Sequence, residues 1–478
     1  MSAPDFSAVA ARIQTSLVES GAPSLAVAVA REGEILWEAA FGWADRERRI
    51  PATPHTMYSL ASISKPITST AIRILHERGK LDVKASVDDY LQAPLRAAAG
   101  GGPATIEQLA NHTSGMPLHY HFFYGDEPAR PPAFTETLRR YGVLYTPPGE
   151  RFQYSNLGYG VLDHVITRCS GVPYADFMRR EVFLPLGMTR VDLGERRELD
   201  PYRAVRYGED GLPNPHYDFD HPGGSAAWAS AHDLIRFGAV HSEAPLSDQR
   251  SILSSESIAE MQRPTTTREH NGYGFGWGSN EDEHGELAIS HSGGMGGVNT
   301  LLKLLPRHRI AVVALCNACG RLPFDIAEDL TAALLPAYAR RLESDRAEAK
   351  PLREPDPPFR GDRRLNGEWS GEAALPDGPL PVALRIARTG EIHVRIGDRL
   401  WSLVNDVKWS QDALTGRMYG DLPGTEVRPP YLLHLDLKLR GRLLNGALVA
   451  RTELAHPQGG APHRRMGDAL SYWLELRR

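Results

Sequence analysis

Hydrophobic and polar positions along this chain repeat with two different periods, and each period predicts a type of element. From Asp5 to about Glu19 the apolar residues follow helical spacing, and Gly21 then ends the pattern, which predicts a terminal helix. The β-prone runs SLAVAVAR and EILWEAAFGWAD follow on either side of Glu32-Gly33 and predict a hairpin.

A second group of strands is predicted some 250 residues later. The stretch GELAISHSGGMGGVNTLLKLLPRHRIAVVALCNA contains three strand candidates, with a turn at Pro306-Arg307-His308. PFDIAEDLTAALLPAYARRLE then predicts one helix. Strands at both ends of a long helical region indicate an antiparallel sheet flanked by terminal helices, of the α/β or α+β class, with an all-helical region between the strand groups.

The pattern changes again after a charged, proline-rich stretch, ESDRAEAKPLREPDPPFRGDRR. Beyond it, LPVALRIAR, EIHVRIG and YLLHLDLKLR alternate apolar and polar residues and are separated by turn signals. We therefore expect a first domain over residues 1–345, a linker over 346–364 and a C-terminal all-β domain, barrel or sandwich, over 365–478.

Composition and charge narrow the function classes. With 478 residues the chain is long enough for two cores, and 41% hydrophobic and 24% charged residues are ordinary globular values. A net charge of -5 without a long basic run argues against nucleic-acid or anionic-membrane partners. The N-terminal residues show no secretory pattern, and no apolar run reaches the roughly 18 residues of a membrane helix. We expect a soluble, cytoplasmic protein.

The cysteines and clustered histidines offer alternatives that we rank lower. Three cysteines are not a disulfide framework, and the C-x-x-C of Cys316 and Cys319 is better explained by a buried strand end than by zinc or redox chemistry. HYDFDHPGG, which begins at His216, gathers metal-ligand types, as do His119 and His121. We interpret these residues as cleft lining and expect neither a metal nor a cofactor.

The candidate chemistry begins with Ser62 and Lys65 in YSLASISKPITSTAIRILHERGKL. Residues three apart on a helix share a face, so the lysine amine can take the serine proton if burial lowers its pKa. A helix that starts at Ser62 also places the backbone N–H of this residue where a developing oxyanion is stabilised. An isolated S-x-x-K is common, however, and a capping serine on an exposed helix is the alternative. The apolar stripe predicts a buried helix that ends at Gly79; it consists of Ile67, Ala71, Ile74 and Leu75.

Two other stretches carry chemistry. In Tyr154-Ser155-Asn156, a phenol near a lysine ammonium would have a lowered pKa, and the asparagine amide can hold a substrate carbonyl or the lysine. The alternative is a turn in which Asn156 caps the next helix. In His291-Ser292-Gly293-Gly294 the glycines let a substrate lie close to the strand, and a free N–H can complete an oxyanion hole; a bulge is the alternative.

The order S-x-x-K, Y-x-N, H-x-G resembles the serine β-lactamase and penicillin-binding protein superfamily. LANHTSGMP, GYGFGWG and GGSAAWASAHDLIRF are similar to its branch of class C β-lactamases, D-aminopeptidases, DD-carboxypeptidases and family VIII carboxylesterases, and the similarity runs from about residue 8 to 340. The resemblance implies a β-lactamase-like fold. It also implies Ser62 as acylated nucleophile, Lys65 as proton acceptor, Tyr154 as the base that activates water, and a substrate and oxyanion site of Asn156, His291, Gly293 and Gly294.

These residues predict a serine hydrolase that acts through an acyl-enzyme. His291 stands where the lactamases carry lysine, and a histidine is mostly neutral at pH 7, which disfavours recognition of a penicillin carboxylate. We expect a carboxylesterase on small esters. The alternatives are a D-stereospecific aminopeptidase or amidase, a β-lactamase or DD-peptidase, and an inactive binding protein of the same fold. The expected partner is a small ester, amide or short peptide, and the sequence predicts no oligomeric state.

Overall fold

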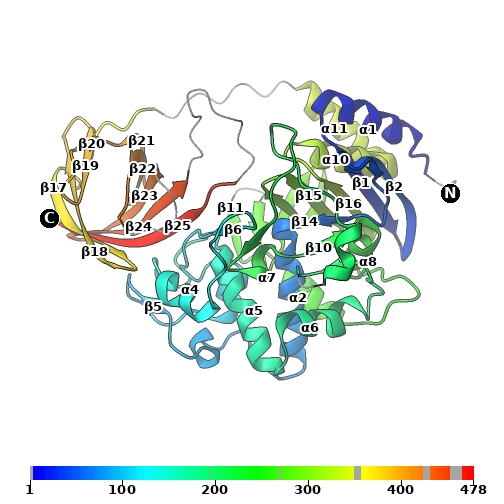
Figure 1. Ribbon diagram of the computed structural model, residues 1–478, viewed down its shortest axis with the longest axis horizontal. Helices are drawn as coiled ribbons and strands as arrows, with labels where there is room; N and C mark the ends of the chain where they lie inside the picture. Colours follow the sequence, from blue (N-terminus) through cyan, green and yellow to red (C-terminus); the bar gives the residue numbers. More distant parts are fainter. Residues whose placement is uncertain (1–3, 195, 269–270, 349–356, 424–430, 453–465) are drawn as a thin grey trace.

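The computed structural model of the protein describes residues 4–194, 196–268, 271–348, 357–423, 431–452 and 466–478. Its larger unit is built on an antiparallel sheet of strand order β11-β12-β13-β14-β15-β16-β1-β2-β3 (Figure 1). β1 pairs with β16 from Leu25↔Cys316 to Arg31↔Ile310, so strands from the two ends of the unit lie side by side, as predicted. The strands are β1 (Ser24–Arg31), β2 (Glu34–Asp45), β3 (Ile50–Pro51), β11 (Thr266–Arg268), β12 (Asn271–Tyr273), β13 (Gly278–Glu283), β14 (Glu286–Met295), β15 (Val298–Leu305) and β16 (Ile310–Cys316).

Helices cover both faces of this sheet because successive strand residues point to opposite sides. Leu25, Val27 and Val29 of β1 pack in a cluster with α1 (Ser7–Ser20), α10 (Leu322–Leu334) and α11 (Pro336–Ala347). Ala26 and Ala28 instead join the cluster that holds α2 (Ser64–Glu77) and α8 (Ala231–His241). The catalytic candidates lie on the α2 side.

The predicted N-terminal helix and hairpin are α1 and the β1–β2 pair, and Cys316 is the buried last residue of β16. The single helix expected over residues 323–343 is wrong: the chain forms α10 and α11 with a break at Leu335. Pro336 causes the break because it has no N–H to donate and disfavours helical geometry in the residue before it. Leu335 is accordingly extended (φ -126°, ψ 97°).

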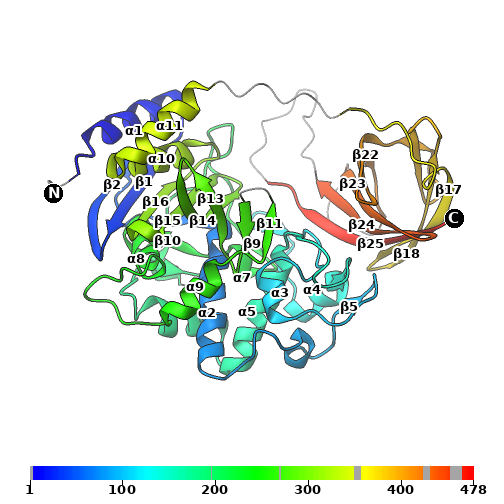
Figure 2. The ribbon, with the colours of Figure 1, turned by 180° about the vertical axis from the view of Figure 1, so that it is seen from behind.

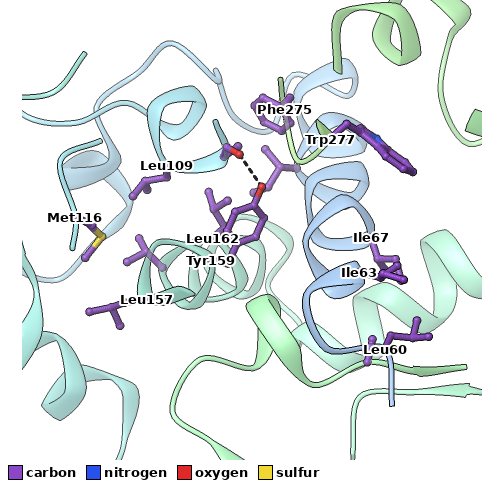
Figure 3. Close-up of a cluster of buried hydrophobic side chains, with 14 of the residues drawn as sticks. Leu60, Ile63, Ile67, Leu109, Met116, Leu157, Tyr159, Leu162, Phe275 and Trp277 are labelled. Atoms are coloured by element: carbon purple, nitrogen blue, oxygen red, sulfur yellow. Dashed lines mark hydrogen bonds between the residues drawn. The ribbon is translucent and has the colours of Figure 1, made fainter. Parts of the chain in front are cut away.

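The expected helical region surrounds α2, whose residues from Ser64 to Leu75 are all buried. α2 packs against α5, which carries Leu157, Tyr159 and Leu162, and Figure 3 shows Ile63 and Ile67 on the opposite side of α2, within the same buried cluster. Truncating a buried isoleucine to alanine typically costs about 2–5 kcal/mol, so α2 is a firmly held support for Lys65. The remaining helices are α3 (Ile106–Ala110), α4 (Phe134–Tyr141), α5 (Asn156–Ser170), α6 (Tyr174–Met178), α7 (Pro222–Ser225) and α9 (Ser255–Gln262), with helical turns η1 (Ala61–Ile63), η2 (Val87–Tyr90), η3 (Arg179–Phe183), η4 (Arg197–Tyr202) and η5 (Pro306–His308). Short strands interrupt them: β4 (Met57–Ser59), β5 (Arg96–Ala97), β6 (Phe122–Tyr124), β7 (Val143–Leu144), β8 (Val191–Asp192), β9 (Tyr217–Phe219) and β10 (Trp228–Ser230).

The C-terminal residues form a second antiparallel sheet, of order β20-β19-β18-β17-β25-β24-β23-β22-β21. The end strands of this order, β20 and β21, are neighbours in the chain, and the sheet curls into a nearly closed barrel, which confirms the all-β prediction (Figure 2). α11 ends at Ala347 and β17 begins at Gly367, and residues 349–356 of the proposed linker lie outside the described residues. The strands are β17 (Gly367–Leu375), β18 (Gly378–Ile386), β19 (Ile392–Ile396), β20 (Ser402–Leu403), β21 (Asn405–Ser410), β22 (Ala413–Gly420), β23 (Tyr431–Arg440), β24 (Leu443–Thr452) and β25 (Ala469–Arg477). In the described parts of both units, no helix has the length and apolar composition needed to cross a membrane.

Candidate active site

Ser62 lies in η1, the helical turn that precedes α2. The helix proper begins at Ser64, two residues later than predicted, because the side chain of Ser64 ties this turn to its surroundings. Ser64 Oγ donates to the Ala61 carbonyl (2.7 Å) and accepts the N–H of Ala227 (3.0 Å). Ala61 takes a left-handed conformation (φ 47°), which is strained for a residue with a side chain. The result is a partly exposed Ser62 between two buried neighbours.

Lys65 stands in the first turn of α2 and is fully buried. Its Nζ lies 2.7 Å from Asn156 Oδ1, 2.9 Å from the Gly224 carbonyl oxygen and 3.1 Å from Ser62 Oγ. Burial lowers the pKa of Lys65 well below its ordinary value and so favours the neutral amine. A neutral amine has two N–H groups and one lone pair. Since the amide and carbonyl oxygens only accept, the N–H groups point at Asn156 and Gly224, and the lone pair faces the Ser62 hydroxyl.

Asn156 is the first residue of α5, and Ser155 is the N-cap of that helix. Ser155 Oγ accepts the N–H of Gly158 (3.1 Å), so the alternative in which Asn156 caps the helix is wrong. With the cap provided by its neighbour, the Asn156 side chain is available to hold the lysine amine. Of the two roles expected for this amide, the contact with the lysine is the one observed.

Tyr154 contacts both Lys65 and Ser62. Its ring centroid lies 4.8 Å from Lys65 Nζ, and its hydroxyl shares a hydrogen bond with Ser62. Burial raises the pKa of Tyr154, and the hydrogen bond with Ser62 offsets only part of that rise. The expected lowering of this pKa is wrong because burial also removes the charge of Lys65, which then stabilises no phenolate. Tyr154 is a neutral phenol that can donate one proton and accept another.

His291 lies on β14 and is almost completely buried. Its Nδ1 is 2.7 Å from the Ser292 carbonyl oxygen, so Nδ1 carries the proton, and Nε2 accepts a hydrogen bond from the Tyr273 hydroxyl (3.0 Å). Burial, together with the neighbouring Lys65, lowers the pKa of His291 to about 3. The imidazole is therefore neutral at pH 7, and it offers a substrate no fixed positive charge.

The two glycines that follow differ in their surroundings. A side chain on Gly293 would place its Cβ 2.0 Å from the Leu60 carbonyl oxygen, so Gly293 lets β14 pack directly on the backbone just before the nucleophile. Gly294 is exposed. β14 pairs with β13 up to Ser290 and with β15 as far as Met295. Within the described residues, the β13 side of β14 is therefore open beyond Ser290.

A cavity of about 910 Å³ is lined by Ser62, Tyr154, His291 and Gly294. Lys65 contacts both Ser62 and Asn156 from the protein interior, and Gly293 packs on the backbone just before the nucleophile. The structure thus brings the predicted residues, which are as far apart as 62 and 294 in the sequence, to one site.

The comparison with protein families agrees with this geometry. Residues 9–336, more than half of the chain, match the model of the Beta-lactamase family.

The chain belongs to the Beta-lactamase family.

Among curated relatives of this Beta-lactamase-family protein, Penicillin-binding protein 4* of Bacillus subtilis is 30% identical over 315 residues, which cover 61% of this chain and 67% of the relative. Protein flp of Staphylococcus aureus is 23% identical over 327 residues, covering 64% of this chain and 61% of the relative. The chain thus spans about two thirds of the length of these relatives.

Solved structures share the fold. The octameric penicillin-binding protein homologue from Pyrococcus abyssi has a TM-score of 0.60 at 24% identity and covers 92% of this chain and 98% of its own, well beyond the family-matched residues. The hydrolase EstCE1 has a TM-score of 0.56 at 22% identity and covers 67% of this chain and 97% of its own. The resemblance stated from the motifs is confirmed.

Several residues of this Beta-lactamase-family site are not among the predicted ones. Gly224 supplies the carbonyl that holds Lys65, and Tyr273 hydrogen-bonds His291. The His112 ring lies 4.3 Å from that of Tyr154, and its Nδ1 accepts the Ser155 N–H (3.2 Å). All of them lie in the stretches LANHTSGMP, GGSAAWASAHDLIRF and GYGFGWG, so the family similarity of these stretches was the available signal.

The suspected metal ligands meet only in part. His119, Asp220 and His221 come together in the interior, where the Asp220 carboxylate binds His119 Nε2 (2.8 Å) and His221 Nδ1 (2.7 Å). Asp163 holds the same loop by accepting the Gly223 N–H (2.6 Å). These contacts support the loop that carries the Gly224 carbonyl. His216 lies apart from them and contacts Asp218.

Proposed function

We propose that this protein is a serine hydrolase that forms an acyl-enzyme on Ser62 and that small carboxylic esters are its preferred substrates. The observation that carries the proposal is the setting of Lys65: its buried Nζ lies 2.7 Å from Asn156 Oδ1, 2.9 Å from the Gly224 carbonyl oxygen and 3.1 Å from Ser62 Oγ. In the neutral amine the first two contacts take the N–H groups, which turns the lone pair to the Ser62 hydroxyl. A buried amine held in this way is a general base whose direction is fixed before substrate binds.

In the acylation step, Ser62 Oγ attacks the substrate carbonyl while its proton moves to Lys65 Nζ. The carbonyl oxygen becomes an oxyanion, for which the backbone N–H groups of Ser62 and Gly294 are the proposed donors. When the tetrahedral intermediate collapses, the bond to the leaving group breaks. Tyr154 passes its hydroxyl proton to that group and regains one from the Lys65 ammonium, so a neutral phenol is the form the step requires.

Deacylation runs the same relay with water as the nucleophile. A water molecule beside Tyr154 attacks the acyl carbonyl, and its proton passes through the phenol to the neutral amine of Lys65. Collapse of the second tetrahedral intermediate returns that proton to Ser62 Oγ and releases the acid. The residues end in the protonation states in which they began, as a catalytic cycle requires.

Esters rank first because an alcohol leaves more easily than an amine, and the neutral His291 supplies no extra positive charge for a demanding substrate. A second candidate is the hydrolysis of D-amino acid amides or short peptides. It is favoured by the size of the cavity, about 910 Å³, which exceeds what a small ester fills.

The decisive experiment is intact-mass analysis after treatment with a fluorophosphonate, combined with turnover of p-nitrophenyl butyrate. We expect one adduct on Ser62, and loss of both the adduct and turnover in Ser62→Ala. Ser290→Ala is the matched control because Ser290 is a second serine, on β14, that lines the same cavity. Equal turnover by Ser62→Ala and the wild type would falsify the nucleophile assignment. A much larger kcat/KM on D-alanine p-nitroanilide than on the ester would reverse the order of the two candidates.

A further inference from the structure

The outer face of the C-terminal sheet is turned toward the larger unit, on the side of β24 and β25 (Figure 1, Figure 2). In β23 the residues Leu433, Leu435 and Leu437 are buried in the barrel, so the alternate residues His434 and Asp436 point outward. On β24 and β25 the outward residues form an apolar cluster with Val143 and Tyr145 of the larger unit; they are Ala447, Val449, Ala469 and Trp473.

Polar contacts fix this placement near the catalytic residues. Tyr120 and Ala469 exchange backbone hydrogen bonds (3.0 and 2.9 Å), and the Tyr145 hydroxyl donates to the Ser471 carbonyl (2.7 Å). Arg151, three residues before Tyr154, pairs with Asp436 at 2.8 Å. The outer face of the sheet is therefore part of the surroundings of Tyr154.

Next to these contacts the two units enclose a hollow of about 660 Å³. Gln153 and Tyr154 line it on the side of the larger unit. Tyr154 also lines the catalytic cavity, so a substrate bound at Ser62 can extend past the phenol toward the C-terminal sheet. The charged side chains of the sheet that line this hollow are Asp406, Lys408, Arg417, Asp436 and Arg451.

The balance of these charges is positive. Asp406 is paired with Arg417, and Asp436 with Arg151, so each carboxylate already has an arginine partner. Arg451 supplies the positive charge that these two ion pairs leave over. Arg451 forms no ion pair with any described residue, and its Nε has no hydrogen-bond partner among them.

The opposite end of the catalytic cavity has the other sign. Asp282, Glu283, Glu328, Asp345 and Glu348 line it. Glu283 pairs with Lys303 (2.9 Å), Glu328 with Arg346 (2.8 Å) and Asp345 with His284 (2.6 Å), and among the described residues Asp282 and Glu348 supply the negative charge that these pairs leave over. An acidic group on a substrate is repelled at that end and attracted toward the C-terminal sheet. His291, being neutral, does not compete for it.

We propose that the outer face of the C-terminal sheet, with Arg451 as its main contact, is a subsite for a carboxylate carried by the substrate of Ser62. The proposal rests on the proposed acyl-enzyme function and adds to it a substrate class, acidic esters or amides. The carboxylate belongs either to the acyl part or to the leaving group, and two pairs of substrates separate these sources.

The test compares kcat/KM within each pair. Mono-p-nitrophenyl glutarate against p-nitrophenyl butyrate places the charge in the acyl part, and 3-carboxyphenyl butyrate against phenyl butyrate places it in the leaving group. In at least one pair we expect the wild type to have the higher kcat/KM on the acidic substrate. Arg451→Glu should lower the ratio of kcat/KM for the acidic substrate to kcat/KM for the neutral one by about 10- to 100-fold, which is the usual contribution of a hydrogen bond to a charged group. Arg395→Glu, an exposed arginine of β19 outside the hollow, should leave the ratio unchanged.

If Arg451→Glu leaves the ratio of the two kcat/KM values unchanged in both pairs, the proposed subsite is overturned. If Arg451→Glu lowers the thermal midpoint, Arg451→Gln decides by the same ratio, because it removes the charge without reversing it. Failure of the proposed function is recognised separately, as absence of the fluorophosphonate adduct on Ser62. In that case calorimetric titration with glutarate decides: binding at least tenfold weaker in Arg451→Glu supports the subsite, and equal or absent binding overturns it.

Discussion

Replacing Asn156 with aspartate tests whether Lys65 acts as a neutral base. The substitution keeps the shape of the side chain but places a carboxylate where an amide oxygen now lies 2.7 Å from Lys65 Nζ. A negative charge stabilises the ammonium form, so the pKa of Lys65, which burial holds well below its ordinary value, moves back up. In the proposed mechanism the neutral amine is the active form, so the activity of this variant should be lost at low pH and recover as the pH rises.

The distance sets the size of the effect. Two unit charges 2.7 Å apart interact by roughly 6 kcal/mol at an effective dielectric constant of about 20, which is an upper limit because the new carboxylate must also be desolvated. Opposite charges this close commonly move a pKa by about one to three units. The acid limb of the kcat/KM profile should move to higher pH by about one to three units. At a given pH on that limb, kcat/KM therefore falls roughly 10- to 1000-fold.

The assay is the pH dependence of kcat/KM for p-nitrophenyl butyrate in the wild type, Asn156→Asp and Asn156→Leu. The leucine variant removes the acceptor without adding charge, and it should lower kcat/KM by a factor that does not shrink as the pH rises. Superimposable profiles for the wild type and Asn156→Asp, or a loss in Asn156→Asp that is constant with pH, would refute the assignment of Lys65 as the base.

Three further results are expected. Tyr154→Phe should lower kcat/KM by about 100- to 10,000-fold at an unchanged thermal midpoint, and a loss below about threefold would exclude the phenol as proton relay. Gly293→Ala forces a Cβ to within 2.0 Å of the Leu60 carbonyl oxygen and should destabilise the fold by about 1–3 kcal/mol or more in urea unfolding; wild-type stability would contradict this packing. Burial lowers the pKa of His241 from 6.5 to about 3, so between these pH values the unfolded state binds the extra proton and stability falls as the pH falls, by about 1.4 kcal/mol per pH unit. His241→Gln should flatten that slope between pH 6 and 5, and equal slopes for the variant and the wild type would contradict it.

Local patterns predicted the elements whose stability depends on their own residues. The alternation in β14, β15 and β16, the helical spacing in α1 and the strands of the C-terminal sheet were all visible in the sequence because the period of the apolar residues follows from backbone geometry. The pairing of Ser62 with Lys65 was visible for the same reason, since one helical turn connects them. Where local rules failed, a specific contact was responsible: Pro336 divided the last helix, and Ser64 moved the start of α2.

The sequence by itself determined which groups were available: a hydroxyl, an amine, a phenol, an amide and an imidazole in a recognisable order. Only the tertiary structure decided the protonation states and the contacts of these groups. The Gly224 carbonyl that holds Lys65 lies 159 residues away in the chain, and the raised pKa of Tyr154 and the lowered pKa of His291 come from burial. Arg451, which lines the hollow beyond Tyr154, comes from β24 of the C-terminal sheet. Burial and long-range proximity depend on how all the elements pack together, which no local pattern contains.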